Sequence, residues 1–115
     1  MILVADDEKG IREVFVEFLG LYGYPADAVE NGEKALNAFD EKKYRMLITD
    51  KNMPVMDGIE LIRNIKQRCP RFPIIAVTGD STEELIEAGA TRCFTKPFDL
   101  DKLRTAIQEI LRPCA

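Results

Sequence analysis

Short apolar runs alternate along this chain with longer stretches in which apolar residues recur every three or four positions. The runs at residues 2–5, 46–49 and 73–77 are continuous, as in strands that are buried on both faces of a parallel sheet. Residues 92–95 form a further predicted strand, and residues 25–29 form a weak one. The pattern therefore predicts five strands.

The stretches between these runs have the periodicity of amphipathic helices, and residues typical of helix ends border them. Asn31 and Asp99 are placed to cap two helices, Pro70 stops another, and a capping-box pattern at residues 81–84 opens a short fourth helix that closes at Gly89. One helix after each strand predicts an α/β fold, a doubly wound five-stranded parallel sheet with helices on both faces.

The composition indicates one globular domain and excludes several kinds of function. The chain has 115 residues, of which 46% are hydrophobic and 31% charged, and its formal net charge is −4. This mild acidity argues against direct nucleic-acid binding. The chain contains no histidine, which excludes His-ligated metal sites, Ser/His or Cys/His catalysis, and phosphohistidine within the chain.

The three cysteines, Cys69, Cys93 and Cys114, are irregularly spaced and do not indicate a disulfide framework. We therefore expect a reducing, cytoplasmic setting. The apolar runs are too short to span a membrane, and Asp6 follows the first run too closely for a signal peptide.

Polar residues with related chemistry stand at the carboxyl ends of four predicted strands. Asp6 and Asp7 follow the first strand, Asp50 the third, Thr78 the fourth and Lys96 the fifth. In open α/β sheets ligands bind at this edge. Two carboxylates about 4 Å apart repel by roughly 4 kcal/mol at an effective dielectric near 20, so three of them require a cation. All-oxygen ligands suit Mg²⁺, and the lysine and hydroxyl suit a phosphoryl group.

Each of these residues also has a simpler structural interpretation. Asp6 and Asp7 fit a turn and a helix N-cap, and Thr78 fits an ordinary strand end. Lys96 alone resembles a solvated surface lysine, and we assign Lys51 to solvated charge in the same way. The joint placement of the whole set favours the functional interpretation.

Several segments match the signature of a known family: residues 4–8, 31–36, 50–58, 77–79, 89–90 and 95–98. Over essentially its whole length the chain resembles the receiver domains of response regulators, and its D-x-x-M-P-x-M-D-G segment is highly specific. The resemblance implies a flavodoxin-like fold with strand order 2-1-3-4-5, with a receiver domain at residues 1–112 and a tail at 113–115.

By this resemblance, Asp50 accepts a phosphoryl group from a phosphohistidine of a sensor histidine kinase or phosphotransfer domain. Thr78 and Lys96 contact the phosphoryl oxygens, and the Lys96–Pro97 peptide is cis. Hydrolysis resets the domain, at a rate that the side chains at Asn52 and Asp80 influence in the family. The domain is then a regulatory phosphoacceptor and not an enzyme acting on other substrates.

The resemblance also implies a magnesium site beside Asp50. Asp7 binds Mg²⁺ directly, Asp6 mainly through water, and the backbone carbonyl of Asn52 completes the protein ligands together with Asp50. The remaining partners implied are an output protein or fused output domain, with no direct nucleic acid, no membrane, and a possible phosphorylation-dependent dimer.

Two departures from the family pattern concern the route from Asp50 to an output surface. Cys93 occupies the position where most members have a switching aromatic residue, and Phe94 stands next to it. The segment from Thr78 to Lys96 is shorter than usual by about four residues, one helical turn, which shortens the fourth helix. We therefore expect an atypical output surface.

Three alternative functions remain open at this stage. An aspartyl-phosphate phosphatase usually has a second Asp two residues after its nucleophile, where this chain has Asn52. A flavin- or nucleotide-binding module needs a phosphate loop after the first strand, where Asp6 and Asp7 are electrostatically unfavourable. A receiver-like scaffold that is not phosphorylated is the third alternative, and Cys93 is the residue that favours it.

Overall fold

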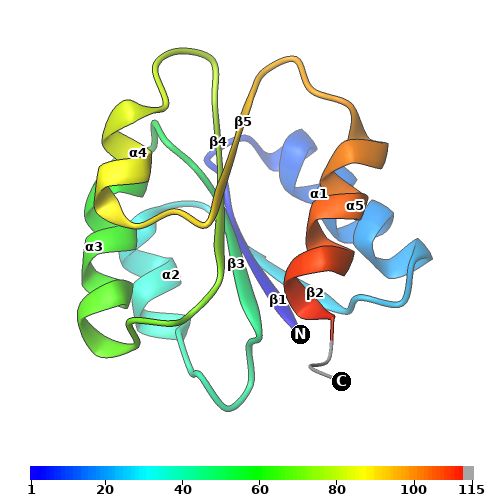
Figure 1. Cartoon of the computed structure of the whole chain (residues 1–115), viewed down its shortest axis with the longest axis horizontal. Helices are drawn as coiled ribbons and strands as arrows, with labels where there is room; N and C mark the ends of the chain where they lie inside the picture. Colours follow the sequence, from blue (N-terminus) through cyan, green and yellow to red (C-terminus); the bar gives the residue numbers. More distant parts are fainter. Residues whose placement is uncertain (113–115) are drawn as a thin grey trace.

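The computed structural model describes residues 1–112 and contains five parallel strands, each followed by a helix (Figure 1). The elements are β1 Ile2–Ala5, α1 Lys9–Leu21, β2 Ala26–Val29, α2 Gly32–Ala38, β3 Met46–Asp50, α3 Gly58–Arg68, β4 Ile74–Thr78, α4 Glu83–Ala88, β5 Arg92–Thr95 and α5 Leu100–Leu111. The predicted tail at residues 113–115, with Cys114, lies outside the described residues. Within residues 1–112, no helix is long and apolar enough to cross a membrane.

The strand order is β2-β1-β3-β4-β5, which confirms the predicted doubly wound sheet. The register aligns Ala5 with Thr49, Asp50 with Val77, and Thr78 with Thr95. The carboxyl ends of the four strands that carry the predicted site therefore lie side by side at one edge of the sheet.

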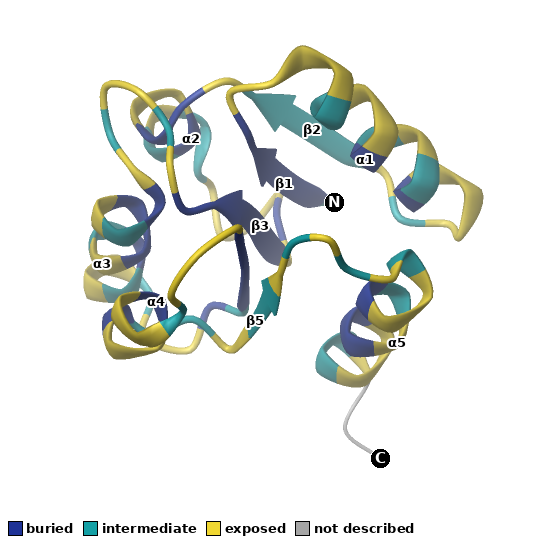
Figure 2. Cartoon of the chain, turned by 90° about the horizontal axis from the view of Figure 1, so that it is seen from above, coloured by how far each residue is buried: buried dark blue, intermediate teal, exposed yellow. Residues whose placement is uncertain are grey.

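Alternation along the strands produces two separate apolar layers. Leu3 and Leu47 point to the face covered by α2, α3 and α4, whereas Ile2, Met46 and Ile48 point to the face covered by α1 and α5. Figures 1 and 2 show these helices on opposite sides of the central strands, which are buried from both faces. This double burial explains why the strands are continuous apolar runs.

The helix ends agree with the sequence signals except at α4. Asn31, Asp57 and Asp99 each accept a hydrogen bond from a backbone N–H in the first turn of the helix that follows. The predicted capping box at residues 81–84 is wrong, because Thr82 is the N-cap and makes no side-chain capping bond. The six-residue length of α4 confirms the short fourth helix.

The loop between β3 and α3 folds back onto the end of β3. The backbone N–H of Gly58 donates to the Lys51 carbonyl at 2.8 Å. A Cβ at position 58 would lie 2.2 Å from the carbonyl oxygen of Asp50, closer than real Cβ contacts. Position 58 therefore requires glycine, and its close approach fixes the backbone of Asp50.

Val55, at the tip of this loop, has an unfavourable backbone conformation. Its φ is +70°, in the left-handed region, and its side chain is exposed. A β-branched residue is rare in this region, and the conformation costs on the order of 1–3 kcal/mol. The contacts that hold the loop against β3 must offset this cost.

Gly58→Ala is expected to destabilise the protein by at least about 2 kcal/mol, because the new methyl group meets backbone that cannot move without displacing Asp50. Gly10→Ala is the matched control, since a Cβ at this α1 position has nothing within 4 Å. The control should be neutral or stabilising by roughly 0.5–1 kcal/mol. Urea unfolding of both variants measures the difference, and equal stability would contradict the packing described for Gly58.

Val55→Asn should stabilise the protein by roughly 1 kcal/mol, because asparagine tolerates the left-handed region and the lost valine side chain is exposed. The measurement is again the midpoint of urea unfolding. A Val55→Ile variant, which keeps the β-branch, should show no gain. Equal effects of the two substitutions would mean that Val55 is not strained.

Candidate functional site

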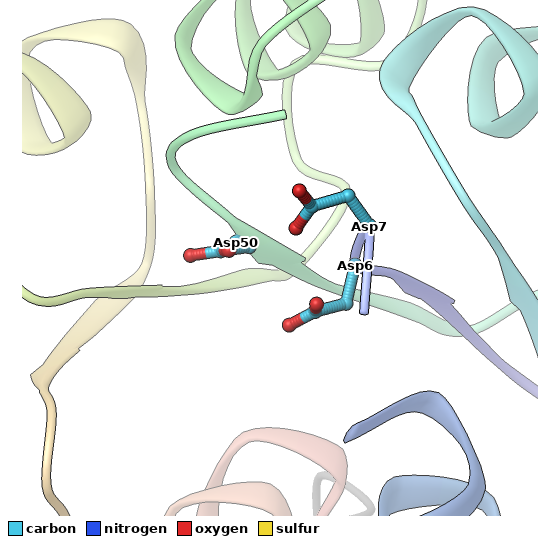
Figure 3. Close-up of side chains that lie close together, drawn as sticks. All are labelled: Asp6, Asp7 and Asp50. Atoms are coloured by element: carbon cyan, nitrogen blue, oxygen red, sulfur yellow. The ribbon is translucent and has the colours of Figure 1, made fainter. Parts of the chain in front are cut away.

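Three carboxylates converge at the carboxyl edge of the sheet (Figure 3). Asp6 and Asp7 come directly after β1, and Asp50 is the last residue of β3. One oxygen from each lies within 4.8 Å of the others. Asp6 and Asp50 are buried, at 1% and 8% exposed, whereas Asp7 is exposed. Asp7 is therefore the member of the cluster that is most open to solvent.

Asp6 has one oxygen with a partner and one without. Its Oδ1 accepts a hydrogen bond from the backbone N–H of Glu8 at 2.9 Å, and the Arg12 guanidinium donates to its backbone carbonyl at 2.8 Å. Its Oδ2 is buried and has no hydrogen-bond partner among residues 1–112. The turn predicted from the sequence is present, but it uses only half of this carboxylate.

Asp50 is contacted by the lysine from the end of β5. Lys96 Nζ lies 3.3 Å from Asp50 Oδ1, which also accepts a hydrogen bond from the backbone N–H of Lys51 at 2.9 Å. The Lys96 side chain is 35% exposed, so it is not the fully solvated lysine of the simpler interpretation. The Lys96–Pro97 peptide is cis, as the resemblance predicts.

Burial raises the pKa of both Asp6 and Asp50 above the usual value for aspartate. At Asp50, Lys96 opposes the rise in pKa and Asp7 adds to it, while at Asp6 both Asp50 and Asp7 add to it. One ammonium group cannot balance three carboxylates that repel each other by roughly 4 kcal/mol per pair. The cluster is therefore short of positive charge.

The residues present fit a hard divalent cation. They offer only oxygen ligands, which Mg²⁺ prefers, and one of these is the unpartnered Oδ2 of Asp6. Asn52 lies exposed in the β3–α3 loop, and its carbonyl accepts no hydrogen bond from the described residues. This carbonyl is thus free to serve as a further ligand.

Thr78 is at the edge of the cluster, but its hydroxyl is engaged elsewhere. The residue is fully buried at the end of β4. Its Oγ1 donates to Asp80 Oδ1 at 3.0 Å and accepts from the Asp80 backbone N–H at 3.1 Å. The structure therefore contains no hydrogen bond between this hydroxyl and Asp50 within residues 1–112.

Lys51 differs from its prediction. The sequence predicts a solvated charge at this position, but the residue is only 9% exposed. Its Nζ donates to Asp80 Oδ1 at 2.7 Å and to the Ser81 carbonyl at 3.0 Å. Hydrogen bonds from Lys51 first, and then from Thr78, lower the pKa of Asp80. No local pattern signals this contact, because the two partners are 29 positions apart.

Cys93 and Phe94 lie on opposite faces of the sheet. Cys93 packs against the layer under α2, α3 and α4, whereas Phe94 packs against the layer under α1 and α5. Phe94 also contacts Phe98, with 5.7 Å between the ring centroids. Phe94 therefore does not take the place of the aromatic residue that Cys93 replaces.

Comparison with known proteins agrees with this fold. The family model described as "Response regulator receiver domain" matches residues 2–108. Sporulation initiation phosphotransferase F of Bacillus subtilis is 33% identical over 114 residues, covering 96% of this chain and 92% of that protein. Sensor protein EvgS of Escherichia coli K12 is 35% identical over 113 residues, covering 95% of this chain but only 9% of EvgS.

Solved structures show the same arrangement. Response regulator TrrA of Thermotoga maritima, in complex with Mg²⁺ and BeF, is 35% identical and superimposes with a TM-score of 0.86, covering 96% of this chain and 97% of TrrA. The sequence, the sheet topology and the matching family model lead to one conclusion: the chain belongs to the response regulator receiver domains of two-component signal transduction.

Proposed function

We propose that Asp50 is the phosphoryl acceptor of this receiver domain. The observation that carries the proposal is the cluster of two buried carboxylates and an exposed one beside a single lysine, at the edge of the sheet where ligands bind. Asp50 is the member of the cluster that Lys96 contacts, and it stands at the centre of the sheet between β1 and β4.

In the proposed reaction, a carboxylate oxygen of Asp50 attacks the phosphorus of a phosphohistidine on a partner protein. The new P–O bond forms as the P–N bond breaks, and the electron pair of the P–N bond returns to the imidazole nitrogen. Water later attacks the phosphorus, and the P–O bond to Asp50 breaks to release inorganic phosphate. Receiver domains are regulatory phosphoacceptors. This domain would therefore carry out only the transfer of the phosphoryl group to Asp50 and the hydrolysis of the resulting acyl phosphate.

Asp6, Asp7, Asp50 and the Asn52 carbonyl would hold Mg²⁺. When bound, Mg²⁺ neutralises charge on the carboxylates and on the transferred phosphoryl group. The support is the unpartnered Asp6 Oδ2 and the shortage of positive charge in the cluster. The structure of TrrA, a relative with the same fold, is a complex with Mg²⁺ and BeF.

Lys96 and Thr78 would contact the phosphoryl oxygens. Lys96 is already 3.3 Å from Asp50, and its ammonium can neutralise one oxygen directly. Thr78 must first give up its hydrogen bond to Asp80.

Since Cys93 replaces the usual aromatic residue and α4 has six residues, we propose that the output surface is atypical.

The partner would be a sensor histidine kinase or phosphotransfer protein, with which receiver domains pair. The chain spans only 9% of EvgS but 92% of sporulation initiation phosphotransferase F. Its relatives therefore include both much longer sensor proteins and proteins of about its own length. The output protein, a cytoplasmic setting, an absence of direct nucleic-acid binding and a phosphorylation-dependent dimer stay predictions. The division into a domain at residues 1–112 and a tail is also a prediction.

The second candidate is a receiver-like scaffold that is not phosphorylated. The observation in its favour is Cys93, which removes the aromatic part of the usual switch. The scaffold predicts that Asp50 never carries a phosphoryl group, so one labelling experiment separates the two candidates.

Incubation with acetyl phosphate and Mg²⁺ should raise the intact mass by one phosphoryl group. The increase should disappear in Asp50→Asn and fall strongly when EDTA removes the metal. Asp57→Asn is the matched control, because it removes a neighbouring exposed carboxylate and asparagine can still cap α3. No increase in the wild type, or an equal increase in Asp50→Asn, would exclude Asp50 as the acceptor.

Asp6→Asn should stabilise the metal-free protein by roughly 1–3 kcal/mol, because it replaces an unpartnered buried oxygen by an amide and removes one repelling charge. The same variant should lose most of the rise in melting temperature that Mg²⁺ gives the wild type. Glu17→Gln, which removes a charge from the exposed face of α1, should change neither value appreciably. A full Mg²⁺ response in Asp6→Asn would contradict the proposed metal site.

A further inference from the structure

Lys51 is a buried lysine directly beside the proposed phosphoryl acceptor, yet its ammonium points away from Asp50. Its side chain is 11% exposed, and lysine is rarely buried unless it is paired. Both of its partners, the Asp80 carboxylate and the Ser81 carbonyl, belong to the turn between β4 and α4. Lys51 therefore ties the loop that follows Asp50 to the turn that follows Thr78.

The hydroxyl of Thr78 meets the same oxygen as Lys51. Asp80 Oδ1 accepts from Lys51 Nζ at 2.7 Å and from Thr78 Oγ1 at 3.0 Å. A hydroxyl group has a single proton to donate. While that proton lies on Asp80, Thr78 cannot donate to an oxygen on a phosphorylated Asp50.

The side chains of Lys51 and Thr78 hold the Asp80 carboxylate in this place. The Asp80 side chain is 61% exposed, so water could satisfy the carboxylate if it turned away from the protein. Gly79, which precedes it, is exposed, and a Cβ at that position would have nothing within 4 Å. The turn is thus loosely packed, and the charge-assisted bond from a buried ammonium is its strongest attachment.

We propose that Lys51 is a positioning residue that holds Asp80 on the Thr78 hydroxyl and thereby opposes engagement of Thr78 with the phosphoryl group. This inference rests on the proposed function of Asp50. It adds a residue that determines how easily the hydrogen bond between Thr78 and Asp80 breaks when Asp50 is phosphorylated. The Lys51 side chain acts through Asp80, and only the backbone N–H of this residue contacts Asp50.

The test is the affinity of the full chain for beryllofluoride in the presence of Mg²⁺, measured by titration calorimetry. Lys51→Met keeps most of the buried volume and removes the ammonium. Binding should tighten about tenfold, the effect expected from losing a charge-assisted hydrogen bond made mainly in the unbound form. Lys51→Arg should restore an affinity close to the wild type, and the exposed control Lys42→Met should not change it.

Two further variants keep the test decisive if Lys51→Met folds poorly. Asp80→Ala removes the same contact from its exposed side, and it should tighten binding in the same direction. In a Thr78→Val background, Lys51→Met should no longer tighten binding, because no hydroxyl proton remains to be redirected. A purely structural role for Lys51 would give the same change with and without the hydroxyl.

Unchanged or weaker binding in both Lys51→Met and Asp80→Ala, while the wild type binds beryllofluoride, would overturn this inference and leave the role of Asp50 intact. A gain that persists in the Thr78→Val background would also overturn it. A wild type that does not bind beryllofluoride at all would overturn the role of Asp50 and this inference together.

Discussion

The mutual repulsion of three carboxylates at one edge of the sheet is the constraint on which the rest of this site depends. The sheet order places β1 beside β3, so the carboxylates at the carboxyl ends of these two strands lie close together. Asp6 and Asp50 are both buried there, and burial raises the pKa of each. Burying carboxylates without sufficient positive charge lowers the stability of the folded protein, and this cost favours a functional role for the cluster.

The neighbouring contacts hold this repulsive cluster in place. Gly58 lets the β3–α3 loop close over the backbone of Asp50, and the Gly32 N–H donates to the Met56 carbonyl, which ties the same loop to the start of α2. Lys51 connects the loop to the β4–α4 turn. Asp50, the proposed acceptor, is therefore held by several backbone contacts, while Asp80, which accepts a hydrogen bond from the Thr78 hydroxyl, stands on the exposed β4–α4 turn.

Much of the fold and of the site could be predicted because both follow from local rules. Continuous apolar runs indicate strands buried on two faces, and parallel topology then brings Asp6, Asp50 and Lys96 to one edge. The adjacent positions of Cys93 and Phe94 on a strand already imply opposite faces.

The features that sequence reasoning missed depend on contacts between distant segments. Lys51 looks like any surface lysine until Asp80 is placed beside it. The capping box at residues 81–84 is not formed: α4 begins at Glu83, one residue later than the pattern predicts, and the Ser81 hydroxyl accepts from the Glu83 N–H at 3.4 Å. The left-handed conformation of Val55 is likewise imposed by the loop and not by the residue.

The central claim is that, among several acidic groups within reach, Asp50 alone forms the acyl phosphate. The most direct test is to phosphorylate the protein, reduce the acyl phosphate with borohydride, and locate the resulting homoserine by peptide mass spectrometry. We expect homoserine at position 50 and unmodified aspartate at positions 6 and 7. Homoserine at position 6 or 7, or an absence of homoserine from a protein whose mass has increased, would contradict it.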